Sequence, residues 1–135
     1  MRRIIFGLTM LLMFGLTSTV SAEIQTYEGV GICYMADSDR IEICRLRSKK
    51  IAERDVLEQI GVYVTSESEV RNFRLTEDEI VTIAAGIMKV TEIRYKLETD
   101  DETAALRVEC RLKAMVDSDE IPVLLERERQ ARLGR

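Results

Sequence analysis

The sequence predicts an α+β fold, a two-layer sandwich with helices on one face of a largely antiparallel sheet. Three observations support it. Residues 88–97 and 104–116 alternate apolar and polar side chains, as half-buried strands do. Residues 40–60 repeat small or apolar side chains every four positions, the spacing of a helix face. A helix-capping signal begins at Thr76. The expected order of elements is β-α-β-α-β-β-α, an arrangement that buries one face of the sheet.

The first 22 residues have the pattern of an export signal. Two arginines precede the apolar run Ile4–Leu16, and small residues then lead to Ala22. The run is shorter than the roughly 20 apolar residues that span a bilayer. We therefore expect cleavage after Ala22, a single domain over residues 23–135, and a periplasmic or secreted protein without stable membrane insertion. An uncleaved N-terminal anchor is the alternative.

Residues 23–35 are predicted to form the first strand. Gly29 and Gly31 fall on one face of it and leave a flat trough, which is typical of a place where another backbone approaches closely. The helix expected over residues 40–60 has a narrow buried stripe that fits this trough. The stripe comprises Cys44, Ser48, Ala52, Val56 and Ile60. Gly61 is expected to end that helix, because glycine is common just after a helix C-terminus.

The segment from Val62 to Val70, extending to Phe73, is interpreted as a second strand with a polar middle, and hence as a sheet edge. Thr76 and Glu79 then form a capping box that starts a short helix, which is expected to stop around Gly86.

Two further strands follow, Met88–Leu97 and Ala104–Val116, joined by a turn at residues 99–102. The second strand alternates six apolar residues with mostly charged ones, which indicates a sheet with one solvated face. A last helix is expected from about Ser118, with Pro122 in its first turn.

The chain has three cysteines, Cys33, Cys44 and Cys110. An oxidising compartment permits one disulfide among them, with three pairings open. Cys33 with Cys44 is the favoured pair, because these two residues bracket the first strand-to-helix turn. The alternative is three buried free thiols, since free cysteine often behaves as a small apolar residue.

Several function classes are disfavoured by composition. The chain has no histidine, and its cysteines lack the spacing of a metal site, so we expect no metal and no cofactor. Templates for a nucleophile elbow and for a phosphate-binding loop are absent, and we expect no catalytic activity. The 24 acidic residues leave an acid–base pair open without indicating one. Loss of Arg2 and Arg3 would move the formal net charge from −4 to −6, which argues against binding to nucleic acid.

Some segments resemble the N-terminal domain of flagellar assembly protein T and related exported bacterial proteins. The similarity starts at Tyr27–Gly31, continues through Ala52–Asp55, Gly61–Val64, Leu75–Ile80 and Ala84–Ile87, and reaches the closing hairpin. The resemblance implies a periplasmic α/β module used for assembly contacts, with no catalytic residues to transfer. The further domains of the flagellar protein have no counterpart in these 135 residues.

We therefore expect a non-catalytic module that binds an unidentified protein partner at the cell envelope. Two polar regions are the candidate contact surfaces. They comprise Ser66, Glu67, Glu69 and Arg71 on the expected sheet edge, and Arg127 and Arg129 on the last helix. The alternative is a periplasmic protein that binds a small ligand or an envelope polymer between the glycine-bearing strand and the first helix.

Overall fold

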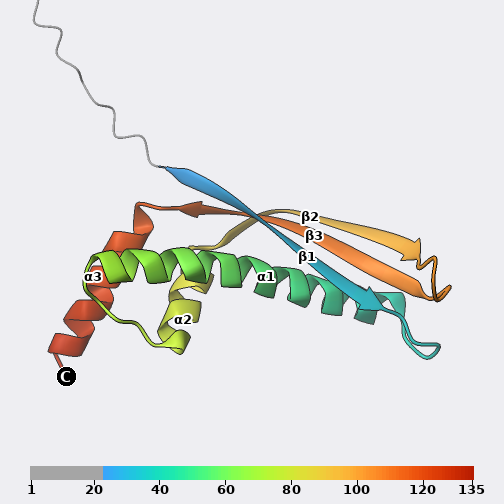
Figure 1. Ribbon diagram of the computed structural model, residues 1–135, viewed down its shortest axis with the longest axis horizontal. Coiled ribbons are helices and arrows are strands. Elements are labelled where there is room, and N and C mark those ends of the chain that lie inside the picture. Colours follow the sequence, from blue (N-terminus) through green and yellow to red (C-terminus); the bar gives the residue numbers. More distant parts are fainter. Residues whose placement is uncertain (1–22) are drawn as a thin grey trace, which may run out of the picture.

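The computed structural model describes residues 23–135; the predicted signal peptide lies outside them. The described part has an α+β fold, as predicted (Figure 1). Its elements in chain order are β1 (Ile24–Tyr34), α1 (Ile41–Val70), α2 (Glu77–Ile87), β2 (Lys89–Thr99), β3 (Leu106–Asp117) and α3 (Glu120–Leu133). The strands form an antiparallel sheet in the order β1-β3-β2. None of the described helices is long and apolar enough to cross a membrane.

The central strand β3 supplies the sheet side of the core. Alternate residues of β3 point toward the helices and are almost completely buried, whereas the residues between them are partly solvated. The buried set is Val108, Cys110, Leu112, Ala114 and Val116. This matches the alternation in the sequence and the expectation of one wet face.

Helix α1 lies directly on the glycine trough of β1, as predicted. A Cβ atom placed on Gly29 would lie 2.3 Å from the carbonyl oxygen of Ala52. A Cβ atom placed on Gly31 would lie 1.9 Å from the carbonyl oxygen of Ser48. Because no real side chain tolerates such contacts, the two glycines are what allows the helix backbone to approach the strand.

The predicted strand from Val62 to Phe73 is wrong, and so is the helix end at Gly61. Helix α1 continues to Val70, so the observed order is β-α-α-β-β-α. Gly61 is buried inside the helix, and a Cβ there would lie 3.2 Å from Ile80 Cγ2 on α2. The glycine therefore allows close helix packing. Val64, fully buried in the core, holds the following turns in helical form.

Asn72, which has a φ of 55°, stops helix α1 just after Val70. The Asn72 N–H donates to the Glu69 carbonyl and the Phe73 N–H donates to the Ser68 carbonyl, each at 2.9 Å. These two bonds are those of a Schellman motif. Asparagine takes the left-handed position here, which is less common than glycine.

The capping box of α2 is confirmed. Glu79 N–H donates to Thr76 Oγ1 at 3.3 Å, and Thr76 N–H donates to Glu79 Oε2 at 2.8 Å. The hairpin and the last helix also form close to their predicted positions, with Pro122 in the first turn of α3.

Candidate functional site

The structure joins Cys33 and Cys44, the favoured pair, in a disulfide with a Cα–Cα distance of 5.6 Å. The bond ties the end of β1 to the first turns of α1. Cys110 is a buried free thiol in the core. Burial raises the pKa of this thiol, so it stays protonated and a poor nucleophile.

The polar residues predicted as one edge surface lie on a helix instead. Ser66, Glu67 and Glu69 occupy the last turns of α1, and Arg71 is its C-cap residue. Residues three or four apart share a helix face, so Ser66 with Glu69 and Glu67 with Arg71 form two pairs on different sides of α1. Ser66 lines a groove against α2, whereas Glu69 lines a pocket under the following loop.

The arginines of α3 hold the loop between α1 and α2. Arg132 lies over the Phe73 ring at 4.7 Å from its centroid, donates to the Arg74 carbonyl at 2.9 Å and pairs with Glu79. The Arg129 guanidinium also lies near the Phe73 ring, 5.8 Å from its centroid.

Of the predicted contact residues, the structure brings together Arg71 and Arg129. Arg129 donates to the Arg71 carbonyl at 3.4 Å, and both residues line a shallow pocket. Arg127 lies apart from them, beside Asp119 and Val123.

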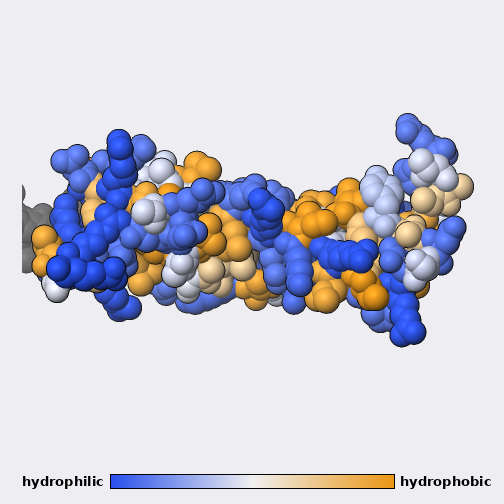
Figure 2. All heavy atoms as spheres, turned by 90° about the horizontal axis from the view of Figure 1, so that it is seen from below, coloured by the Kyte–Doolittle hydropathy of each residue, from blue (hydrophilic) through white to orange (hydrophobic). Residues whose placement is uncertain are grey.

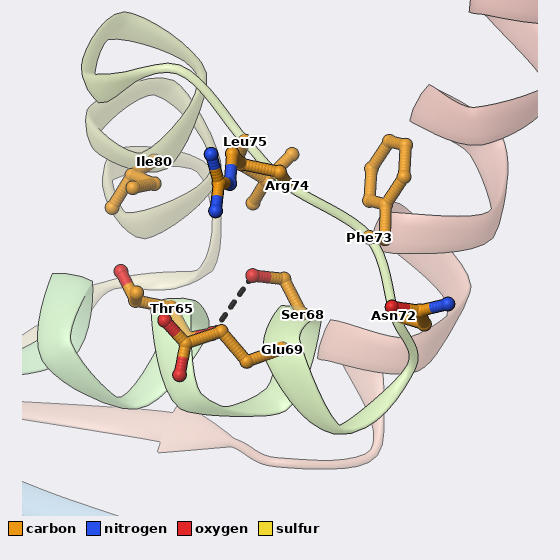
Figure 3. A pocket seen from close by; sticks show the side chains of 8 residues that line it. All are labelled: Thr65, Ser68, Glu69, Asn72, Phe73, Arg74, Leu75 and Ile80. Atoms are coloured by element: carbon orange, nitrogen blue, oxygen red, sulfur yellow. Dashed lines mark hydrogen bonds between the residues drawn. The ribbon is translucent and has the colours of Figure 1, made fainter.

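A small pocket of about 260 Å³ lies under the loop that follows α1 (Figure 3). Two hydroxyl groups line it, and both already donate to α1 carbonyls. Thr65 donates to Gly61 and Ser68 donates to Thr65, each at 2.8 Å. The two hydroxyl groups are therefore engaged with the helix, and the Asn72 amide and the Arg74 guanidinium are the remaining side-chain donors that line the pocket.

A larger groove of about 590 Å³ separates α1 from α2. Its floor and walls are mostly apolar, and charged residues rim it. Val62 and Val81 on its walls are 69% and 49% exposed. The remaining lining residues are Arg54, Leu57, Glu58, Gly61, Thr65, Ser66, Glu77 and Ile80.

The space between β1 and α1, expected to hold a ligand in the alternative hypothesis, is closed. The backbone carbonyls of Ser48 and Ala52 fill the trough of Gly29 and Gly31. A ligand site in this position is therefore contradicted by the packing.

Figure 2 shows several patches of exposed apolar side chains, one of which lies over the part of the molecule that holds the N-terminal half of α1. On α1 they are Ile41, Ile43, Leu46 and Ile51. On β2 they are Ile93, Tyr95 and Leu97, which are 37%, 42% and 49% exposed and which we call the apolar row. The apolar row is paired with inward-facing residues of β3, so it points to the helix side of the sheet.

The apolar row is exposed because the helix layer does not extend over it. Helix α1 lies against β1 and β3, and α2 has only 11 residues and ends just before β2 begins. Arg45 of α1 reaches the row and lies 5.7 Å from the centroid of the Tyr95 ring. The three side chains of the row are each between about a third and a half exposed.

The two outer strands differ in how their free edges are covered. At β1, the Val30 N–H donates to Asp55 Oδ2 at 3.1 Å, and Gln59 Nε2 donates to the Glu28 carbonyl at 2.8 Å. Helix α1 thus occupies backbone groups in the middle of the β1 edge. Strand β2 has no neighbour on its outer side within residues 23–135.

The register shows which β2 residues direct their backbone groups outward. Backbone groups in an antiparallel ladder alternate between the two sides of a strand. The backbone N–H of Val30 donates to Asp55 of α1, so it points away from β3. Arg111, the β3 partner of Val30, therefore directs its backbone groups away from β1 and toward Arg94 of β2. The residues on either side of Arg94 therefore point outward. The apolar row consequently offers free N–H and C=O groups together with its exposed side chains.

Sequence reasoning missed this edge. The alternation of Ile93, Tyr95 and Leu97 with charged residues is visible as a strand signal. Nothing local shows that the apolar face lacks a covering helix.

No family model, curated protein or solved structure matches this chain. The described residues also contain no cluster of histidine, cysteine or acidic side chains suited to hold a metal ion.

Proposed function

We propose that this protein is an exported, non-catalytic interaction module of the cell envelope, and that it binds a protein partner through the free edge of β2. The observation that carries the proposal is the apolar row, which combines unpaired backbone groups with exposed apolar side chains. A partner strand added to such an edge gains backbone hydrogen bonds, and its side chains cover the apolar ones.

Two further features support the compartment and the class of function. The Cys33–Cys44 disulfide fits an oxidising environment outside the cytoplasm. An assembly role also agrees with the resemblance to the flagellar assembly domain. The hydroxyl groups of the loop pocket and the Cys110 thiol are engaged or buried, which favours binding over catalysis.

Photo-crosslinking in cells that export the full chain tests the proposal. A photoactivatable residue at Leu97 reports on the β2 edge, and one at Val62 in the C-terminal half of α1 is the exposed control, since the two are 49% and 69% exposed. We expect discrete protein adducts from position 97 in the envelope fraction. Equal adducts from both positions, or none from position 97, would contradict the assignment.

A second candidate function is binding of an apolar small ligand in the groove between α1 and α2. It is favoured by the 590 Å³ volume and the exposed Val62 and Val81. Fluorescence of an apolar dye distinguishes it. Enhancement that Val81→Arg abolishes and Tyr95→Arg leaves unchanged would support the groove instead of the edge.

A further inference from the structure

We propose that the partner of the β2 edge is a second copy of this chain. Two β2 strands would pair antiparallel and form a continuous six-stranded sheet in the order β1-β3-β2-β2-β3-β1. This inference rests on the proposed function, because it takes β2 as the binding edge. Edge-to-edge pairing is a natural consequence of a long uncovered edge strand, unless the sequence prevents it.

The charges on the other face of β2 are arranged for such pairing. Charged residues lie between and on either side of the residues of the apolar row. They are Glu92, Arg94, Lys96 and Glu98, which we call the charged row. In the antiparallel register centred on Arg94, which pairs residues 92–96 on the regular side of the irregularity between Val90 and Glu92, residue 94 faces residue 94 of the second copy. Glu92 then faces Lys96 of the second copy, and the two-fold axis produces this opposite-charge pair twice.

The single like-charge contact of this register is already compensated. Arg94 faces Arg94 of the second copy, and Arg111 of β3 lies opposite each Arg94 on its other side. Each Arg94 forms an ion pair with Glu92, and each Arg111 forms one with Glu109. Each Lys96 likewise pairs with Glu98 of its own strand. The charged row therefore forms ion pairs of opposite sign both within each strand and between the two strands.

The same register brings two members of the apolar row into contact. Ile93 faces Tyr95 of the second copy, again twice, on the helix side of the sheet. These are the side chains that the short α2 leaves uncovered. Pairs of an aromatic and a β-branched residue are favourable across antiparallel strands.

The blocked β1 edge limits the assembly to two copies. Asp55 and Gln59 occupy backbone groups of β1, so a further strand cannot pair along it without breaking these bonds. One self-complementary edge per chain produces a closed two-fold dimer, whereas two open edges would allow a growing filament.

Sedimentation equilibrium of the chain from Glu23 onward, which contains every described element, tests the inference. We expect a monomer–dimer equilibrium. Tyr95→Arg should weaken the dimer at least tenfold, while Tyr95→Phe should retain it. Val62→Arg is the matched control, because Val62 is exposed in a groove that only α1 and α2 residues line. Circular dichroism confirms that each variant is folded.

Charge reversal tests the register. Glu92→Lys and Lys96→Glu should each weaken the dimer, because each places like charges opposite one another. The double variant restores opposite charges across the two-fold axis and should recover most of the lost affinity. Failure to recover would overturn the register centred on Arg94.

The remaining outcomes separate the two proposals. A monomer at all concentrations, with adducts to another protein still formed at position 97, overturns the dimer and leaves β2 as a binding edge. A monomer without such adducts overturns both. A dimer that Tyr95→Arg does not weaken, or that Val62→Arg weakens equally, also overturns the inference.

Discussion

The carbonyl oxygen of Ser48 lies 1.9 Å from the position that a Cβ on Gly31 would occupy. This relationship sets the distance between α1 and the sheet. The contact involves the helix backbone, which has no rotamer to change. The helix must therefore move as a whole if residue 31 acquires a side chain.

Gly31→Ala is accordingly expected to lower the free energy of unfolding by about 3 kcal/mol, the upper range for overpacked sites. Gly86→Ala is the matched control. Gly86 lies within α2, and a Cβ added to it would have no atom within 4 Å, so alanine should raise stability by about 0.5–1 kcal/mol. Urea unfolding of the two variants measures both effects, and equal effects would contradict the close approach.

The disulfide prediction concerns the turn between β1 and α1. Cys33 and Cys44 are separated by 11 positions, and closing a loop of this size stabilises a fold by about 2–3 kcal/mol. We expect reduction, or replacement of both residues by serine, to lower the urea midpoint correspondingly. Cys110→Ala should keep the full sensitivity to reductant, because Cys110 forms no disulfide.

Thiol labelling of the same proteins provides a second measurement. The unreduced native chain should take no label, since Cys110 is buried and its pKa is raised by that burial. Unfolding without reductant should expose one reactive thiol. Three labelled thiols in the unreduced unfolded chain would show that the disulfide is absent.

Local signals predict much of this fold. The trough of Gly29 and Gly31, and the capping box at Thr76, each depend on a few neighbouring residues, and both are predictable from them. The segment after Ile60 is not. Gly61 and β-branched valines favour a helix stop and a strand locally, but burial of Val64 in the core and packing of Gly61 on α2 overcome these preferences.

The β2 edge depends on information that no local pattern contains. Its alternation predicts a half-buried strand, which normally implies a covered apolar face. Whether Tyr95 is covered depends on the strand order and on where α2 ends, and both are decided by long-range packing. The incorrect prediction of a strand at residues 62–73 also places an edge strand there instead of at β2.

The capping box predicts a specific pH dependence. The N–H of Thr76 donates to the Glu79 carboxylate and lowers the pKa of that group below its ordinary value of 4.5, and Arg132 lowers it further. A lowered pKa means that the folded state binds this proton less readily than the unfolded chain. The contribution of the Glu79 carboxylate to folding stability is therefore present above pH 4.5, and it is lost as the pH falls through the folded-state pKa.

Glu79→Gln should remove the loss of folding stability that protonation of Glu79 causes at acid pH. The measurement compares urea unfolding at about pH 6 with that at a pH below about 4, on either side of the ordinary glutamate pKa. The wild type should lose more stability between the two conditions than the variant does. Thr76→Ala should cost about 1 kcal/mol near neutral pH, because it removes the cap hydroxyl. An identical acid loss in wild type and Glu79→Gln would be inconsistent with the assigned cause.

The arginines of α3 differ in their expected contribution to stability, because Arg132 contacts the loop before α2 and Arg127 does not. Arg132 stacks on Phe73, donates to the Arg74 carbonyl and pairs with Glu79, so it joins three parts of the chain. Arg132→Ala should lower the free energy of unfolding by about 1–2 kcal/mol, since a cation–π contact and a charge-assisted hydrogen bond are lost together. Arg127→Ala should stay within about 0.5 kcal/mol of wild type, as exposed substitutions usually do. Thermal and urea unfolding measure both. A larger loss for Arg127 than for Arg132 would mean that the loop is held by other contacts. The expected result would leave Arg127, rather than Arg132, as the α3 cation free to meet a partner.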